Sequence, residues 1–382
     1  MPTSPVHVIG AGPAGLAVAA SLARRGVRAV VVEKSSDVGA SWRAHYDRLR
    51  LHTTRRWSSL PGLPIPRSAG RWVRRDDFVR YLETYARHHR IDLAAGVEVF
   101  GVERPEPGTG DWLLHATGGR RLRAAAVVVA TGHTPKLPDW PGLDDYAGEL
   151  LHASAYRTPE PFRGRDVLVV GSGNSGAEIA ADLASGGAGR VRLAVRTAPH
   201  ILRRATLGWP TQANAILCRG LPVVLTDRLI RLGARQLPNL ARYGLPRPEQ
   251  GLYSRAREGS IPVLDAGLVR AVRRGLVQPV AAVESFDGCK VVLANGETIG
   301  PDVVIAATGY RSGLGPLVGY LGVLDGDGRP LVHGAETHPA AAGLYFIGYT
   351  NPISGNLREL ARDAPKIAAA IAQRHAVGGR RP

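Results

Sequence analysis

Two glycine-rich segments, Gly10–Gly15 and Gly171–Gly176, have the G-x-G-x-x-G spacing that suits the binding of a dinucleotide. Each follows a short apolar run, Val6–Ile9 or Val167–Val170, and precedes an alanine-rich stretch that predicts a helix. In this context the glycines allow a tight turn and a close approach of the backbone to a pyrophosphate, which faces the free N–H groups of the helix start. Two such turns predict two bound nucleotides and electron transfer between them. We expect contacts from Gly10, Gly12, Pro13, Ala14 and Gly15, and from Gly171, Gly173, Asn174, Ser175 and Gly176.

The residue after the second predicted strand of each unit distinguishes the two sites. In the first unit this residue is Glu33, followed by Lys34. A carboxylate there can accept hydrogen bonds from a ribose diol and would repel a 2′-phosphate, so the first site suits the adenosine of FAD or NAD. In the second unit the strand pattern ends in Arg196 and Thr197, as expected for the 2′-phosphate of NADP. The alternative is that Arg196 is one of many solvated arginines.

The composition limits the classes of partner. The 382 residues carry a formal net charge of +17, but only four of the 49 basic residues are lysines, and the arginines are scattered. We therefore expect no nucleic-acid partner. The two cysteines, Cys218 and Cys289, form no C-x-x-C pair, which argues against a redox-active disulfide and a metal site. No apolar run reaches the roughly 18 residues of a membrane span, and the first strand pattern leaves no room for a signal peptide, so we expect a cytoplasmic protein without a membrane partner.

The order of the patterns predicts an α/β fold with two Rossmann-like dinucleotide-binding domains. Apolar residues on one face predict a helix over Asp76–His89. Two strand patterns end in Ala130-Thr131-Gly132 and Ala307-Thr308-Gly309, which we interpret as crossings between the domains and as further cofactor contacts. Residues 1–161 and 306–382 would then form the first domain. Residues 162–305 would form the second, inserted in the first, with a helical subregion at about 205–260 that could be a lid or a substrate wall.

Three segments outside the glycine turns carry more specific motifs. They are Gly39-Ala-Ser-Trp42-Arg43, Tyr46-Asp-Arg-Leu-Arg-Leu-His52 and the segment Tyr146–Tyr156, of the form Y-x-G-x-x-x-H-x-x-x-Y. With Phe162–Glu178, Pro262–Asp265 and Ala307–Arg311, they resemble the class B flavin monooxygenases, and within them the YUCCA-type indole-3-pyruvate monooxygenases. The chain departs from that pattern at Tyr146, where the family has Phe, and after His52, where Thr53-Thr54-Arg55 replaces Leu-Pro-Lys. The second departure puts the exact substrate in question rather than the reaction class.

The resemblance implies a reaction cycle and roles for further residues. NADPH on the second domain would reduce FAD on the first, and the reduced flavin would take up O2 as a C4a-(hydro)peroxide that oxygenates a small molecule. Trp42, Arg43 and Thr131 would lie near FAD. His52 takes the place of an Asn found near the flavin in N- and S-oxygenating relatives, so it is a candidate catalytic and cofactor-binding residue; a structural role is the alternative. His152 and Tyr156 would set the linker between the domains.

The expected reaction is the oxidative decarboxylation of an aryl or alkyl 2-oxo acid, such as indole-3-pyruvate. Arg203 and Arg204 are candidate partners for the substrate carboxylate, although solvation is an alternative for at least one of them. N- or S-oxygenation and Baeyer–Villiger oxidation stay open, as do an NADPH oxidase or reductase without oxygen transfer and a non-catalytic nucleotide-binding regulator. The sequence leaves open whether the protein is a monomer or a homodimer.

Overall fold

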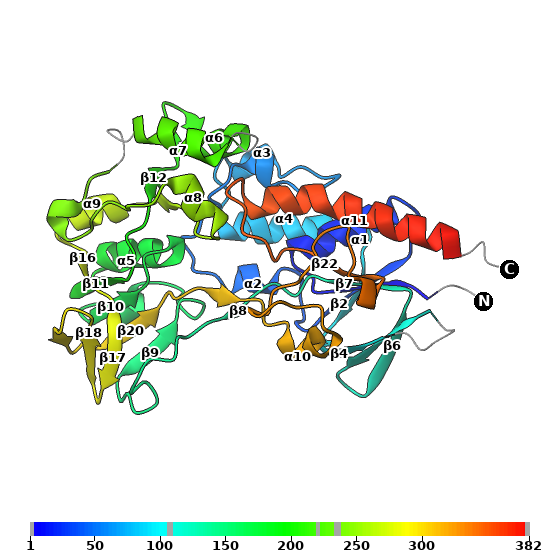
Figure 1. Cartoon of the computed structure of the whole chain (residues 1–382), viewed down its shortest axis with the longest axis horizontal. Coiled ribbons are helices and arrows are strands. Elements are labelled where there is room, and N and C mark those ends of the chain that lie inside the picture. Colours follow the sequence, from blue (N-terminus) through cyan, green and yellow to red (C-terminus); the bar gives the residue numbers. More distant parts are fainter. Residues whose placement is uncertain (1–3, 105–109, 219–221, 233–237, 379–382) are drawn as a thin grey trace.

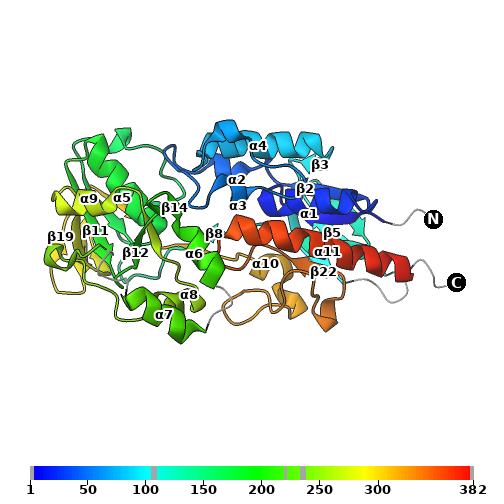
Figure 2. The same ribbon diagram turned by 90° about the horizontal axis from the view of Figure 1, so that it is seen from above.

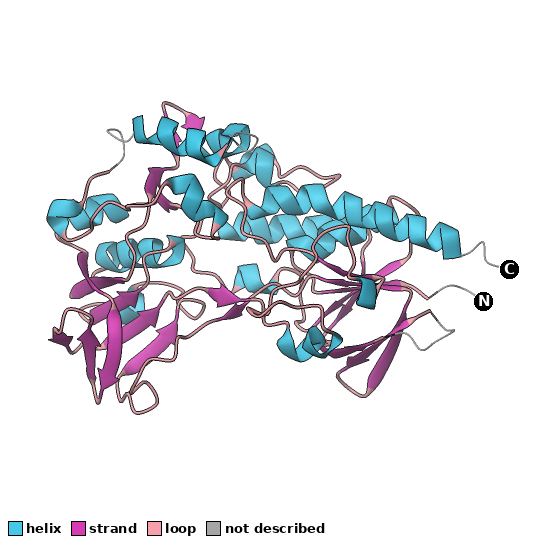
Figure 3. Ribbon diagram, in the orientation of Figure 1, coloured by secondary structure: helices cyan, strands magenta, loops and turns pink. Residues whose placement is uncertain are grey.

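The chain folds into two α/β units that lie side by side along its longest axis (Figure 1). The structure is a computed structural model and describes residues 4–104, 110–218, 222–232 and 238–378. Each unit is built on a parallel sheet with helices packed against it, as Figure 3 shows. The predicted α/β class with two Rossmann-like units is confirmed.

The first unit contains a parallel sheet of five strands. Their order is β22 (Leu344–Phe346), β7 (Ala126–Val129), β1 (Val6–Ile9), β2 (Ala29–Glu33) and β3 (Asp92–Ala95). All four residues of β1 and all four of β7 are buried. Such continuous apolar runs are typical of central strands that are covered on both faces. After the first glycine turn the chain forms a helix and then the strand β2, as the sequence predicted.

The second unit repeats this arrangement. Its parallel sheet has the order β16 (Gln278–Ala281), β11 (Arg190–Val195), β10 (Asp166–Val170), β20 (Val303–Ala306) and β9 (Glu149–His152). In each unit, three antiparallel strands precede the return to the parallel sheet. These strands are β4 (Val99–Glu103), β5 (Trp112–Ala116) and β6 (Arg120–Ala124) in the first unit, and β17 (Val283–Asp287), β18 (Lys290–Leu293) and β19 (Thr298–Ile299) in the second.

The pairing of one strand, β9, does not agree with the predicted domain boundary at residue 162. The strand β9 precedes that boundary, yet it pairs in parallel with β20, with Glu149 beside Val303 and His152 beside Ala306. No glycine turn or helix marks β9 in the sequence, so the predicted boundary leaves its four residues in the first domain. We propose that the second domain begins at about residue 149, and that the crossings on either side of it are the domain linkers.

The two Ala-Thr-Gly segments do lie where the chain passes between the units. The short strands β8 (Thr134–Pro135) and β21 (Tyr310–Arg311), which follow these segments, pair with each other in antiparallel fashion. The outgoing and returning chains therefore run side by side. Each segment directly follows a buried strand, β7 or β20, at the carboxyl edge of its sheet. Ligands of open parallel sheets bind at this edge.

The helices pack around the two sheets, and they include the helix predicted after each glycine turn, α1 (Pro13–Ala23) and α5 (Asn174–Gly186). The helix predicted over Asp76–His89 is α4 (Arg75–His88), with its apolar face buried. In the first unit α1 packs along the C-terminal helix α11 (Asn356–Gly378), as two views show (Figures 1 and 2). The remaining helices of the framework are α2 (Ala40–Arg43), α3 (Arg55–Ser58), η1 (Arg67–Ala69), η2 (Glu160–Phe162), α9 (Leu268–Arg273), α10 (Gly315–Val318), η6 (Gly319–Leu321) and η7 (Pro339–Ala341). Among the described residues, no helix has both the length and the apolarity to span a membrane.

The predicted helical subregion is closed at its base by two strands. β12 (Ile201–Arg203) and β15 (Val263–Asp265) pair in parallel and bracket it in the sequence. Between them lie a small hairpin, β13 (Ala205–Thr206) and β14 (Trp209–Pro210), and the helices α6 (Thr211–Leu217), α7 (Val223–Leu232), η5 (Ala241–Tyr243) and α8 (Leu252–Arg257). The sequence missed the hairpin, because two-residue strands carry no alternation that a pattern could reveal.

Candidate active site

Two glycines of the first turn have different surroundings: one allows close packing of the helix, and the other faces open space. A Cβ atom on Gly15 would lie 1.9 Å from the carbonyl oxygen of Gly10, so this glycine lets α1 pack against the turn. A Cβ atom on Gly12 would meet no heavy atom within 4 Å. Gly10 itself has φ +107°, which favours glycine. The turn therefore presents a bare backbone, followed by Pro13 as the first residue of the helix, to the space in front of it.

Glu33 ends β2 beside this turn and its carboxylate is fixed by the backbone. One oxygen accepts a hydrogen bond from the N–H of Ala11 at 2.6 Å, and the other accepts one from Ser35 at 2.9 Å. The residue is 9% exposed. Each carboxylate oxygen can accept a further hydrogen bond, so the geometry suits the hydroxyl groups of a ribose.

The second glycine turn has the same construction. A Cβ atom on Gly176 would lie 1.9 Å from the carbonyl oxygen of Gly171, whereas one on Gly173 would meet no heavy atom within 4 Å. Arg196 and Thr197 follow β11 and are exposed, and the Thr197 carbonyl accepts a hydrogen bond from Ser172. Both turns thus have the open middle glycine that a pyrophosphate needs.

The side chain of Asn174 binds protein rather than facing the solvent. Its amide donates to the Pro262 carbonyl at 3.1 Å, and its oxygen accepts from the Leu264 N–H at 2.9 Å. It therefore ties the start of α5 to β15, at the base of the helical subregion. This contact explains why Pro262–Asp265 lies next to the second turn in space, although the sequence separates them.

A large cavity of about 1940 Å³ lies between the two units and under the helical subregion. Of the predicted site residues, its wall contains Gly10, Gly12, Pro13, Ala14, Glu33, Lys34, Trp42, His52, Ala130, Thr131, Gly132, Asn174, Ser175 and Gly309. The predicted residues outside its wall are Gly15, Arg43, Gly171, Gly173, Gly176, Arg196, Thr197, Ala307 and Thr308. The cavity thus extends from the first turn past His52 to the start of α5. Most of the second turn is not part of its wall.

The helical subregion forms one wall of this cavity. Thr206, Gln212 and Tyr253 are among the residues that it contributes. Gln212 is buried and accepts a hydrogen bond from the Thr54 N–H while donating to the Ser354 carbonyl. The wall is therefore fastened to segments of the first unit, which supports the predicted wall rather than a free lid.

Trp42, Arg43 and Thr131 occupy different environments. Trp42 lines the cavity and packs edge-on against Phe78 of α4, with 4.5 Å between the ring centroids. Arg43 points away from the cavity wall and forms an ion pair with Glu83. Thr131 lines the cavity, and its hydroxyl lies 2.7 Å from that of Tyr349, whose pKa burial raises to about 12.

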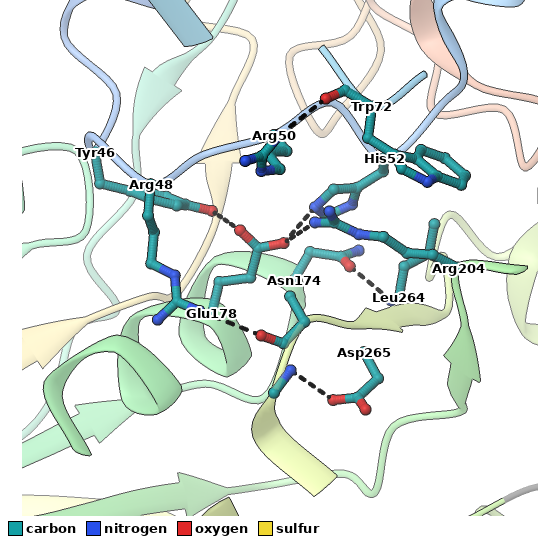
Figure 4. Close-up of polar contacts among 12 residues, drawn as sticks. Tyr46, Arg48, Arg50, His52, Trp72, Asn174, Glu178, Arg204, Leu264 and Asp265 are labelled. Atoms are coloured by element: carbon teal, nitrogen blue, oxygen red, sulfur yellow. Dashed lines mark hydrogen bonds and ion pairs between the residues drawn. The ribbon is translucent and has the colours of Figure 1, made fainter. Parts of the chain in front are cut away.

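His52 belongs to a buried polar cluster that the sequence alone did not reveal (Figure 4). Its Nε2 lies 2.7 Å from Oε1 of Glu178, and Nη2 of Arg204 lies 2.9 Å from the same oxygen. The hydroxyl of Tyr46 donates to Oε2 of Glu178 at 2.9 Å. Burial by itself would raise the pKa of Glu178, but the hydrogen bond from His52, the charge of Arg204 and the hydrogen bond from Tyr46 outweigh it, so this pKa lies below its usual range. Burial and the nearby carboxylate raise the pKa of Tyr46 well above its ordinary value, so Tyr46 remains a neutral donor.

The two candidate partners of a substrate carboxylate differ in availability. Arg204 is engaged with Glu178 and does not line the cavity, so the prediction that it binds substrate is wrong for this arrangement. Arg203 does line the cavity and is exposed, with no side-chain partner among the described residues. The side chains of consecutive residues on an extended segment point to opposite sides, which explains the difference.

The predicted linker residues contact both units. His152 lies with Nε2 3.0 Å from the carbonyl of Gly309 on the returning chain. The hydroxyl of Tyr156 donates to Asp182 of α5 at 2.9 Å. These contacts place both side chains at the junction of the units, outside the cavity wall, as expected for linker residues.

Comparison with known proteins agrees with this geometry. Residues 7–206 match the family model described as pyridine nucleotide-disulphide oxidoreductase. The chain is 39% identical to "Indole-3-pyruvate monooxygenase YUCCA1" of Oryza sativa subsp. japonica, over 90% of this chain and 86% of that protein. It is 34% identical to "Probable indole-3-pyruvate monooxygenase YUCCA3" of Arabidopsis thaliana, over 96% of this chain and 86% of that protein. Among solved structures, a mutant of the flavin monooxygenase from Stenotrophomonas maltophilia aligns with a TM-score of 0.77 at 25% identity, over 98% of this chain and 100% of the other.

The similarity to the plant proteins extends over nearly the whole chain. Cys218 and Cys289 are both free in the structure. The resemblance found in the sequence is therefore confirmed. This chain belongs to the YUCCA-type family of flavin monooxygenases, and it is an enzyme.

Proposed function

We propose that this enzyme binds FAD on the first unit and NADPH on the second, and oxygenates a 2-oxo acid in the cavity between them. One observation carries the proposal: a single cavity joins the open glycine of the first turn, His52, and the start of α5 next to the second turn. A nucleotide on the first turn would therefore lie in this cavity, and one on the second turn would meet it at the start of α5, at Asn174 and Ser175. Bound FAD supplies the transfer of electrons from NADPH and the activation of O2.

The residues around the first turn fit FAD. The bare backbone at Gly12 leaves room for a pyrophosphate against the start of α1, and Glu33 is fixed in position to accept ribose hydroxyls. Trp42 and Thr131 line the same cavity and would contact the bound flavin there. We assign Arg43 a supporting role instead, because its ion pair with Glu83 fixes α2 to α4.

The residues around the second turn fit NADPH. Gly173 leaves the same opening as Gly12, and Arg196 stands at the end of β11, where a 2′-phosphate would lie. Arg196 is exposed and has no side-chain partner among the described residues, so its charge is available to a phosphate. Asn174 acts by holding the adjacent β15 segment rather than by its own contact with the nucleotide.

The substrate class rests on the relatives and on the charge of the cavity wall. The named plant relatives are indole-3-pyruvate monooxygenases, and an aryl 2-oxo acid carries a carboxylate beside its ketone. Arg203 lines the cavity with its guanidinium unpaired among the described residues, and a charge-assisted contact to a carboxylate suits it. The reaction would insert one oxygen atom next to the ketone carbon and release carbon dioxide, while the second oxygen atom leaves as water.

The chain itself contributes three things to this chemistry. Arg203 orients the substrate by its carboxylate, His52 supplies a polar atom beside the reacting groups, and the fastened helical wall covers one side of the cavity. None of these roles requires a side chain to form a covalent bond with the substrate.

A substrate panel tests the proposal. NADPH oxidation should be measured with aryl 2-oxo acids, ketones, amines and thioethers, and the products identified by mass. We expect phenylpyruvate and indole-3-pyruvate to give the arylacetic acids. Oxygenation of amines or thioethers alone would overturn the 2-oxo acid class but leave the monooxygenase assignment. Peroxide release equal to NADPH oxidation with every compound would instead indicate an oxidase.

A further inference from the structure

The carboxylate of Glu178 lies buried where the two units meet, and three side chains donate to it. Glu178 is 3% exposed and belongs to α5, the helix that begins at the second glycine turn. Two of its donors, Tyr46 and His52, come from the first unit, and the third, Arg204, comes from the base of the helical subregion. Figure 4 shows the donors converging on this one side chain.

The charges of Glu178 and Arg204 compensate each other, so the cluster is nearly neutral when His52 itself is neutral. Arg204 lies 2.9 Å from Oε1 of Glu178 and is 17% exposed, so it compensates the carboxylate at close range. Tyr46 donates a neutral hydrogen bond to the other oxygen. Because buried charges are stable when paired, a carboxylate that already has an arginine partner needs only a neutral donor from the imidazole.

The geometry then fixes which ring nitrogen of His52 carries the proton. Nε2 lies 2.7 Å from Oε1 of Glu178, and a carboxylate can only accept, so Nε2 must carry a hydrogen. In the neutral ring Nδ1 is then an acceptor, and it has no hydrogen-bond partner among the described residues. His52 lines the cavity, so Nδ1 is the ring nitrogen left for a group bound there.

We propose that Glu178 is a positioning residue that holds neutral His52 as the Nε2–H tautomer, so that His52 offers an acceptor rather than a donor to the reacting groups. The contact with Glu178 uses the hydrogen on Nε2 and leaves the other ring nitrogen of His52 as an acceptor. The inference deepens the proposed function at the same site and rests on it for the identity of the reacting groups. An acceptor there can take up or share a proton from an O–H group in the cavity.

Each element that packs against His52 contributes a charged or titratable group. Glu178 faces it from α5, Arg204 from the segment after β12, and Tyr46 and Arg50 from its own segment; Arg203 lines the same cavity. Arg50 donates to the Trp72 carbonyl at 3.4 Å, so its charge is held on the first unit.

The chain offers a matched control one turn further along the same helix. Asp182 is also a buried carboxylate on α5 with a tyrosine donor, Tyr156, and an arginine partner, Arg48. Arg48 comes from the same segment as His52. Asp182→Asn therefore disturbs a similar ion pair between the units without touching His52.

The test is the nitrogen-15 NMR spectrum of the FAD-bound enzyme labelled at histidine, with His52 assigned by its loss in His52→Asn. Wild type and Asp182→Asn should show His52 as a neutral ring with hydrogen on Nε2. In Glu178→Gln the amide can itself donate to Nε2, so we expect a substantial shift toward the Nδ1–H tautomer. This readout needs no substrate, so it stands apart from any failure of the proposed reaction.

Kinetics with phenylpyruvate give the second readout. Glu178→Gln should lower kcat by about 10²-fold or more, with a change of less than about 3-fold in KM, whereas Asp182→Asn should keep kcat within about 3-fold. A wild-type His52 that carries its hydrogen on Nδ1, or on both nitrogens, would overturn the proposal even if Glu178→Gln did not fold. The same tautomer in wild type and folded Glu178→Gln would also overturn it.

Discussion

The substitution Gly12→Val tests the first nucleotide site with little damage to the fold. Gly12 has φ −77° and ψ −179°, an extended conformation that any residue adopts. A Cβ atom there meets no heavy atom of the protein within 4 Å. The expected cost to folding is therefore about 1 kcal/mol, the loss of a favourable glycine at the start of a helix. Gly15→Val would instead force atoms within 1.9 Å of a backbone oxygen and disrupt the turn itself.

The cost to FAD binding should be much larger. The added side chain occupies the space through which a pyrophosphate approaches the backbone, and each charge-assisted hydrogen bond that is lost costs about 1.5–3 kcal/mol. One lost contact thus weakens binding by about 10- to 150-fold, and two by the product of such factors. We expect the purified variant to be colourless yet folded.

The assay is the visible flavin spectrum of the purified protein, with FAD titrated into the apoprotein by calorimetry and thermal unfolding as the fold control. Gly173→Val is the matched variant, because the second turn has the same open geometry. It should keep its flavin and lose NADPH affinity. A yellow Gly12→Val enzyme with full flavin content, or a colourless Gly173→Val enzyme, would refute the assignment of the two sites.

Further predictions concern charged side chains. Arg196→Ala should raise KM for NADPH by about 10- to 150-fold with little change for NADH; equal use of both nucleotides by the wild type would contradict the assignment. Arg203→Met should raise KM for phenylpyruvate by a similar factor, and an effect of Arg257→Met instead would move the carboxylate site to Arg257, which also lines the cavity. The pKa of Glu178 lies below the usual 4.5, so its contacts stabilise the folded state above that pH and the contribution is lost as the pH falls through the lower folded value. The difference in Tm between wild type and Glu178→Gln should accordingly stay constant above pH 4.5 and shrink as the pH falls further; a difference in thermal unfolding that stays constant at lower pH would argue against it.

Local signals in the sequence were enough for the framework of the fold. Contacts within a short stretch of chain determine the glycine turns, the buried strands before them, and the acid or arginine after the next strand. The helix α4 was found because its buried face repeats with helical spacing. The strand β9 was assigned to the wrong unit, because its partner β20 lies far along the chain and nothing local marks it.

The candidate site was predicted only in part for a similar reason. His52 lines the cavity as expected, but its partner Glu178 is more than a hundred residues away, on the next unit. The sequence likewise treated Arg203 and Arg204 alike, whereas the extended backbone turns only Arg203 toward the cavity wall. Partners that meet across the junction of two units leave no periodic or short-range pattern to detect.

The most direct test of the central claim follows the oxygen atoms. Phenylpyruvate and NADPH should be incubated with the enzyme under oxygen-18 gas, and the acid product, carbon dioxide and peroxide measured together. We predict phenylacetic acid with one oxygen-18 atom, with one carbon dioxide released for each NADPH oxidised. Phenylacetic acid without oxygen-18, or peroxide equal to NADPH with no acid formed, would contradict the account.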